Sequence, residues 1–212
     1  MTNWLVLAGG RGTRFGQPKI FAEFGPGTFL SHCLAVIAGC SEPGDRVIVS
    51  VADDSDAGTI DRVADSAADA PFENGVTLSV VGDRLAEAGP AHAIGVAADA
   101  TLKDGGDIVI MAVDMLGVRA KHLAALRAHV RASAANAQPS VVVARRGDRP
   151  HWTLAAIPEC LAPKVVRDAE SVSSLQSLYL LNPVLYVDIE ANALLDVNTP
   201  SLVPPLPERP DR

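Results

Sequence analysis

The chain has few cysteines, no long apolar run and no excess of basic residues, and each of these shortages excludes a class of protein. Its three cysteines, Cys33, Cys40 and Cys160, are an odd number, and none belongs to a C-x-x-C pair. The sequence therefore indicates neither a disulfide framework nor a zinc knuckle. The apolar stretch at residues 4–8 is too short for the core of a signal peptide, and no run reaches the length that spans a bilayer. We expect a cytoplasmic protein with no membrane segment.

The net charge of the chain limits the kinds of ligand that it can bind. The chain has 18 Lys and Arg against 25 Asp and Glu, which gives a formal net charge of −7. Affinity for nucleic acid comes mainly from many basic contacts to phosphates, so an acidic chain is a poor general binder of nucleic acid. From Met1 to Ala22, however, there is no acidic residue at all. We therefore expect a small anion, bound by one locally basic loop.

Short apolar runs alternate with longer segments of helical period, a pattern typical of a parallel sheet covered by helices. The predicted strands cover residues 4–8, 46–51, 77–81, 107–113, 140–144, 153–157 and 184–188. The predicted helices cover residues 56–70, 90–102 and 120–131, and a further helix is capped by Thr28 and ends near Gly39. The sequence predicts an α/β fold: a single Rossmann-like domain over residues 1–202, with a mostly parallel sheet and helices on both faces. The proline-rich tail, residues 203–212, is expected to be extended or frayed.

The first predicted strand leads into a glycine-rich loop, and residues 5–19 read Leu-Val-Leu-Ala-Gly-Gly-Arg-Gly-Thr-Arg-Phe-Gly-Gln-Pro-Lys. Glycine lets the backbone take a positive φ and approach a ligand closely, and successive N–H groups turned to one side form a concave anion site. Arg11, Arg14 and Lys19 add three positive charges. The loop is therefore predicted to bind phosphate.

Two common phosphate loops fit this segment poorly. The P-loop of nucleoside triphosphatases needs a hydroxyl residue after its lysine, but Ile20 follows Lys19. The dinucleotide-binding pattern needs a glycine where Phe15 stands, although Asp53 after the second strand keeps this alternative open.

Acidic residues follow several predicted strands, and ligands of such sheets bind beyond the carboxyl ends of the strands. Asp53, Asp83 and Asp114 come after the second, third and fourth predicted strands. One crevice is therefore expected to collect these residues together with the glycine-rich loop.

The pattern Leu-Ala-Gly-Gly-x-Gly-Thr-Arg-x-Gly-x-Pro-Lys resembles the signature of nucleotidyltransferases, and within them the MobA-like branch of molybdenum cofactor guanylyltransferases and cytidylyltransferases. Segments 82–90, 113–114, 148–155 and 195–202 are similar to later motifs of that branch in the same order. The chain also departs from the branch. Gln17 and Pro18 precede Lys19 where an acidic residue is usual, Met115 follows Asp114 where a proline is usual, and an arginine pair expected near residues 170–174 is missing. Residues 89–93, Gly-Pro-Ala-His-Ala, lean toward sugar nucleotidyltransferases.

The resemblance implies transfer of a nucleoside monophosphate from a triphosphate to a phosphorylated acceptor, with release of pyrophosphate. GTP is the favoured donor, with CTP as the other candidate, and molybdopterin is the acceptor by resemblance. A sugar-phosphate nucleotidyltransferase and a catalytically inactive nucleotide-binding protein remain alternatives. The expected catalytic residues are Arg14, Lys19 and Asp114. The expected nucleotide-binding residues are Leu7, Ala8, Gly9, Gly10, Arg11, Gly12, Thr13, Arg14, Lys19, Asp83 and Gly89.

Magnesium prefers oxygen ligands and is often held by one or two carboxylates plus phosphate oxygens, so Asp114 is the expected anchor for Mg²⁺. Asp196 and Asn198 lie two residues apart, and in an extended segment both point to the same side; an Asx turn is the alternative. His151 and Trp152 follow a basic turn and are predicted to contact the acceptor, unless the tryptophan packs on the domain edge. His32, His122 and His129 fall on predicted helices, where exposed positions account for them.

Overall fold

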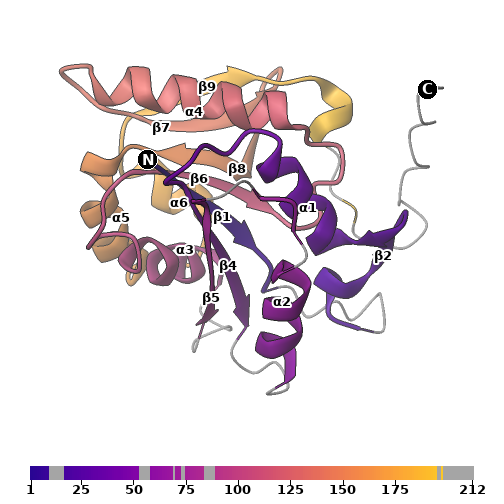
Figure 1. Cartoon of the computed structure of the whole chain (residues 1–212). Coiled ribbons are helices and arrows are strands. Elements are labelled where there is room, and N and C mark those ends of the chain that lie inside the picture. Colours follow the sequence, from indigo (N-terminus) through magenta and orange to yellow (C-terminus); the bar gives the residue numbers. More distant parts are fainter. Residues whose placement is uncertain are drawn as a thin grey trace.

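The structure is a computed structural model that describes residues 1–9, 17–52, 58–68, 70–72, 75–83, 89–194 and 197, without the side chains of residues 59, 67, 68 and 83. The predicted boundary between residues 202 and 203, and the tail beyond it, lie outside the described residues. The fold class predicted from the sequence is confirmed, because the described chain forms a mostly parallel sheet between two layers of helices (Figure 1).

Seven strands form the main sheet, in the order β5-β4-β1-β6-β8-β7-β9. Six of the strands are parallel to one another, and β8 alone runs antiparallel to its neighbours β6 and β7. The seven predicted strands are confirmed, although β8 begins earlier than expected. Their bounds are β1 Thr2–Leu7, β4 Arg46–Ala52, β5 Thr77–Asp83, β6 Asp107–Ala112, β7 Val141–Arg146, β8 Arg149–Ile157 and β9 Val184–Asp188.

Helices cover both faces of this sheet, each with its own hydrophobic cluster. The first face carries α1 Phe29–Ala38, α2 Gly58–Ala68 and α4 Ala120–Ala134. The second face carries α3 Pro90–Asp99, α5 Ala162–Ala169 and α6 Leu175–Leu180. Shorter elements are η2 Lys19–Phe21, the hairpin β2 Glu23–Phe24 and β3 Gly27–Thr28, η4 Glu159–Leu161 and η5 Ala191–Leu194. None of the described helices is both long and apolar enough to cross a membrane.

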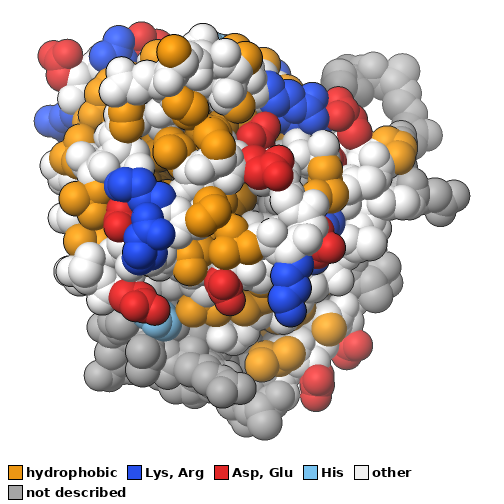
Figure 2. Space-filling model, turned by 90° about the vertical axis from the view of Figure 1, so that its left-hand side faces the viewer, with side chains coloured by type: hydrophobic (Ala, Val, Ile, Leu, Met, Phe, Trp, Pro, Cys, Tyr) orange, Lys and Arg blue, Asp and Glu red, His pale blue; other side chains and the backbone are white. Residues whose placement is uncertain are grey.

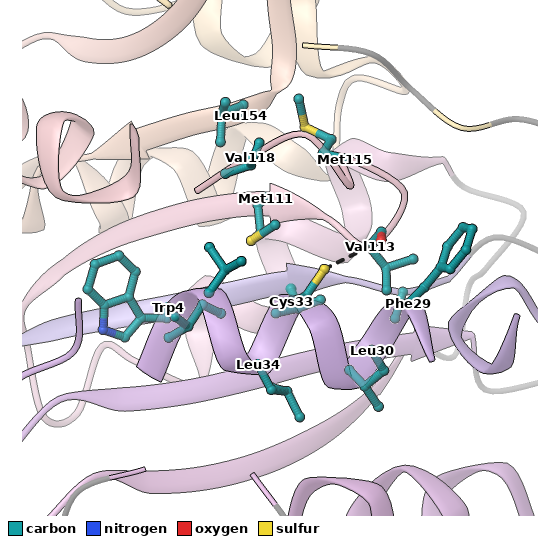
Figure 3. Close-up of a cluster of buried hydrophobic side chains, with 14 of the residues drawn as sticks. Trp4, Phe29, Leu30, Cys33, Leu34, Met111, Val113, Met115, Val118 and Leu154 are labelled. Carbon is teal, nitrogen blue, oxygen red and sulfur yellow. Dashed lines mark hydrogen bonds between the residues drawn. The ribbon is translucent and has the colours of Figure 1, made fainter. Parts of the chain in front are cut away.

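Helix α1 begins and ends where the sequence predicted. The Thr28 hydroxyl accepts from the N–H of Ser31 at 3.2 Å, while the Ser31 hydroxyl accepts from the N–H of Thr28 at 2.8 Å. This reciprocal cap satisfies backbone N–H groups that the helix itself leaves without partners. Leu30, Leu34 and Ile37 are almost fully buried against the sheet. Figure 3 shows Leu30 and Leu34 on the helix, with Cys33 directed toward the end of β6. The cap sets where α1 begins, and the apolar stripe packs the helix on one face of the sheet.

Asp45, between α1 and β4, anchors the opposite end of the sheet. Its side chain is 1% exposed and accepts from the backbone N–H of Thr2 at 2.7 Å. It also accepts from the indole N–H of Trp4 and the backbone N–H of Glu42, each at 3.0 Å. A buried carboxylate is tolerated only when hydrogen bonds replace its hydration. Asp45 is therefore a structural residue far from the carboxyl ends of the strands.

Figure 2 shows the side of the molecule at the left of Figure 1, where α3 and α5 lie. Hydrophobic side chains are spread over this face, and the basic side chains visible there lie beside acidic ones. Positive and negative side chains are therefore interspersed on this face.

Candidate active site

The strand order places a switch point at the carboxyl end of β1, which is where an open α/β sheet forms its ligand crevice. From β1 the chain moves to β4 on one side, and it later returns to β6 on the other side. Ligands of open α/β sheets bind at such switch points, because the connections leave the two neighbouring strands in opposite directions. Lys19 follows β1 and Asp114 follows β6, so both residues belong to the loops that border this crevice.

Lys19 and Asp114 meet there. Lys19 Nζ lies 2.6 Å from Asp114 Oδ2, and the two side chains are 12% and 18% exposed. Lys19 begins the short helix η2, whose next residues, Ile20 and Phe21, are buried. The buried neighbours fix the backbone of Lys19, so its side chain reaches the crevice from a rigid base. The structure thus brings together two of the three residues that the sequence assigned to catalysis, and the third, Arg14, lies outside the described residues.

Helix α1 holds the turn that carries Asp114. The Cys33 thiol donates to Val113 O at 3.4 Å (Figure 3), and His32 Nε2 donates to Leu116 O at 3.2 Å. Burial and the charge of Asp114 raise the pKa of the Cys33 thiol, so Cys33 stays a neutral donor. Burial and the Arg119 charge lower the pKa of His32. Two consecutive side chains of α1 therefore bond the carbonyls on either side of Asp114.

The sequence interpretation of two histidines was wrong. His32 is half-buried, and its ring meets the Phe24 ring edge-on at 4.8 Å between centroids. His122 is buried, and its Nδ1 accepts from the N–H of Arg119 at 3.0 Å, which caps α4. His129 is exposed, as expected. A helix that is apolar on most sides buries its polar residues as well, and this was the available signal for His32.

The segment before the tail also contacts the Asp114 turn. The N–H of Val197 donates to Asp114 O at 3.1 Å. A Cβ on Gly117 would overlap Asn192 O and lie 2.9 Å from Ala193 Cα, so only glycine lets η5 approach this closely. Asp196 and Asn198, the other predicted metal ligands, lie outside the described residues.

The predicted nucleotide-binding residues are described only in part. The N–H of Ala8 donates to Ser50 O at 2.8 Å, and the N–H of Val113 donates to Leu7 O at 3.1 Å, so the end of β1 is fixed on both sides. A Cβ on Gly9 would meet no atom closer than Ala52 N at 3.7 Å. Gly10, Arg11, Gly12, Thr13 and Arg14 lie outside the described residues.

Two further predicted nucleotide-binding residues lie at neighbouring elements. Asp83 ends β5, but its side chain is not described. Gly89 caps α3 with a φ of 93°, and a Cβ there would lie 2.5 Å from Ser173 O. The fold itself therefore requires glycine at position 89, whatever Gly89 contributes to nucleotide binding.

The two predicted acceptor-binding residues lie on different faces of the sheet. His151 is paired with Ala144, which is buried on the face of α1 and α4. Between His151 and Ala155, β8 contains three residues with no partner on β7, which forms a bulge. Trp152 contacts Tyr179 and Tyr186 on the other face, with ring centroids 6.3 Å apart in each case. His151 therefore shares its face with the Asp114 turn, whereas Trp152 packs against Tyr179 and Tyr186 on the opposite face.

Asp114 is the described residue best suited to hold a metal ion. In the described part of the chain the Asp114 carboxylate accepts one hydrogen bond, from Lys19 at Oδ2, and none reaches its Oδ1. No group of three or more His, Cys, Asp or Glu side chains that could hold a metal occurs among the described residues. One carboxylate completed by phosphate oxygens and water suits a hard divalent cation.

A family model described as the MobA-like NTP transferase domain matches residues 4–180 of this chain. The chain belongs to this family. The matched region includes both Lys19 and Asp114. Membership in the MobA-like family establishes a nucleotidyltransferase ancestry, and it agrees with the resemblance found in the loop sequence.

Solved structures share the fold. The crystal structure of Rv0371c from Mycobacterium tuberculosis H37Rv is 21% identical, with a TM-score of 0.65 and 93% of each chain covered. Molybdopterin-guanine dinucleotide biosynthesis protein A from Archaeoglobus fulgidus is 18% identical, with a TM-score of 0.65 over 94% of this chain and 93% of that one. The structure of Rv0371c in complex with manganese is 18% identical, with a TM-score of 0.58 over 89% and 88%. No curated protein shows a significant match.

Proposed function

We propose that this chain is a magnesium-dependent nucleotidyltransferase, which transfers a nucleoside monophosphate from a triphosphate to a phosphorylated acceptor and releases pyrophosphate. GTP is the favoured donor, and molybdopterin is the first acceptor to test. The contact between Lys19 and Asp114 carries the proposal, because Lys19 ends the loop predicted to bind phosphate and Asp114 is a carboxylate at the switch point of the sheet. Membership in an NTP transferase family supports the same reaction class.

In the proposed reaction, an oxygen of the acceptor phosphate attacks the α-phosphorus, and the bond to the pyrophosphate oxygen breaks. Phosphoryl-group chemistry of this kind needs positioning and charge neutralisation more than covalent help. Lys19 and Arg14 are proposed to place positive charge on the triphosphate. The backbone N–H groups of residues 9–13 are proposed to bind its phosphate oxygens. His151 is proposed to orient the acceptor, and contact of Trp152 with the acceptor stays a prediction.

Asp114 is the proposed anchor of the divalent cation, with Asp196 and Asn198 as further ligands. When bound, such an ion neutralises the charge that grows on the phosphate oxygens during transfer. The Rv0371c structure with manganese supports a divalent metal in this fold. Asp83 is proposed to accept from the N–H groups of guanine. Gly9 has no side chain beneath the proposed base, and an added Cβ there would come within 3.7 Å of Ala52 N, so we propose that glycine leaves room for a purine.

Pyrophosphate release tests the proposal. The full chain is incubated with each ribonucleoside triphosphate, Mg²⁺ and either molybdopterin or a panel of sugar phosphates. We expect release with GTP and molybdopterin. Asp114→Asn should lower the rate by about 10²–10³-fold, as loss of a charge-stabilising group does. Asp104→Asn, at an exposed ion pair with Arg46, is the control and should stay active. A fully active Asp114→Asn would remove the metal assignment, and triphosphate binding without turnover on any acceptor would refute the enzyme.

A further inference from the structure

The hairpin of β7 and β8 has two arginines at its tip. Arg146 and Arg149 are directly opposite in the strand register, and Gly147 and Asp148 form the turn between them. Gly147 has a φ of 54°, the sign that a two-residue hairpin turn with glycine in first place requires. Both arginines are exposed. The turn therefore fixes two like charges next to each other on one face of the hairpin.

Neither arginine of this pair forms an ion pair with a described residue, although the acidic Asp148 lies in the turn between them. Neighbouring Arg145 is paired with Asp188, with N–O distances of 3.0 and 3.1 Å. Arg127 and Arg131 are likewise paired with acidic side chains. Like charges directly opposite on two strands destabilise a hairpin. An acidic protein that neutralises these other arginines, yet keeps this pair together, presents a site for an external anion.

The arginine pair lies on the same face of the sheet as the candidate active site. Residues that pair across strands point to the same side, and side chains two residues apart along a strand share a face. His151 pairs with Ala144, which is buried on the face of α1 and α4. Arg149 is two residues from His151, and Arg146 is two residues from Ala144, so all three side chains form one column.

The column also lies at the end of the sheet where Asp114 follows β6. Because β8 is antiparallel to β6, the start of β8 lies beside the end of β6, where Asp114 follows. The Thr153 hydroxyl donates to Met115 Sδ at 3.6 Å, which ties β8 to the turn that carries Asp114. The column of Arg146, Arg149 and His151, here called the arginine strip, therefore borders the crevice of Lys19 and Asp114.

We infer that the arginine strip binds a second anionic group of the acceptor, a phosphate or carboxylate that does not take part in transfer. This inference rests on the proposed function for the existence of an acceptor, but not for the binding of the anion. Guanidinium groups bind such oxygens through paired, charge-assisted hydrogen bonds. The acceptor class is then a small molecule with at least two negatively charged groups, one that attacks and one that the strip binds. Molybdopterin has one phosphate and no carboxylate, so the effect of the strip is expected with those sugar phosphates of the panel that carry a second anionic group.

Inorganic phosphate, titrated at constant ionic strength, is the first probe. The readout is the NMR signal of the His151 imidazole C–H, assigned with His151→Asn. We expect phosphate to shift this signal in the wild type and in Arg167→Gln. Arg167 is an exposed arginine on α5, and its replacement removes one positive charge away from the strip, against two in the double variant below. The shift should disappear in the double variant Arg146→Gln/Arg149→Gln. Loss of the response only in this variant supports the strip, whereas no response in the wild type, or an equal response in the double variant, overturns it.

Turnover provides the second measurement and separates the two proposals. The double variant should raise KM for the acceptor by at least about tenfold, as loss of charged hydrogen bonds does, with kcat and KM for the triphosphate unchanged. An unchanged KM for the acceptor with normal turnover would overturn the strip and leave the proposed function standing. A phosphate response without any pyrophosphate release would leave the strip standing and refute the proposed function.

Discussion

Replacing Lys19 with methionine should make the protein bind a divalent cation more tightly in the absence of nucleotide. Lys19 contacts Asp114 at 2.6 Å, and both side chains are mostly shielded from water, at 12% and 18% exposed. A hydrogen bond between charged groups contributes about 1.5–3 kcal/mol net. A cation on either oxygen of Asp114 must displace or repel the Lys19 ammonium. Removing the ammonium should therefore raise metal affinity by about 10–100-fold, at about 1.4 kcal/mol per tenfold.

Mn²⁺ is a suitable probe, because its electron paramagnetic resonance signal reports the free ion directly. Titration of the wild type and Lys19→Met with Mn²⁺ alone gives the two affinities. Lys121→Met is the matched control, since Lys121 also lies 2.6 Å from a carboxylate, that of Glu190, at an exposed position. Its Mn²⁺ affinity should equal that of the wild type. The reasoning is refuted if Lys19→Met binds Mn²⁺ no better than the wild type. The same variant should release pyrophosphate about 10²–10³-fold more slowly, because the bound triphosphate no longer has the positive charge of Lys19 beside it.

Three further predictions concern stability. Asp45→Ala leaves three N–H groups, two of them buried, without their acceptor and should lower the free energy of unfolding by about 3 kcal/mol in urea titrations; a loss below 1 kcal/mol, about the net value of one hydrogen bond, would contradict this role. Gly117→Ala should lower Tm because its Cβ overlaps η5, whereas Gly58→Ala in α2, where a Cβ meets nothing within 4 Å, should keep or raise it; equal Tm changes would argue against the overlap. The pKa of His32 is lowered in the folded protein, so the unfolded chain binds the proton more readily. Stability should be fully present above the unfolded pKa of about 6.5 and fall as pH drops below it, and His32→Gln should flatten this slope in urea titrations at several pH values.

The sheet and four helices were predictable because their signals are local. Apolar runs bounded by turn residues identify buried strands, and the Thr28 cap marks the start of α1. Helices α5 and α6 were missed because they are short, with 8 and 6 residues, and isolated helices of that length are marginal. Packing supports α5: Gly95 of α3 lets Ala169 approach so closely that an added Cβ would lie 2.7 Å from that of Ala169.

The bulge in β8 was also beyond the reach of sequence patterns. Regular alternation along a strand does not tell which of His151 and Trp152 faces the crevice. In the bulge, the residues without a partner on β7 take their positions from contacts with β6, Tyr179 and Tyr186. A shift of one residue in register moves a side chain to the other face. Side-chain direction at this edge is therefore a property of strand pairing, which residues distant in sequence determine.

By itself, the sequence determined the chemistry that is available: a glycine-rich basic loop after the first strand, and an isolated carboxylate after the fourth. Backbone freedom, charge and apolar period are properties of neighbouring residues, so they can be read along the chain. Only the tertiary structure decided that Lys19 and Asp114, 95 residues apart, lie in contact. Only the tertiary structure, likewise, decided that Cys33 and His32 hold the Asp114 turn. Such contacts depend on strand order and on the packing of α1 against the sheet, which are set by the burial of the whole core rather than by any local pattern.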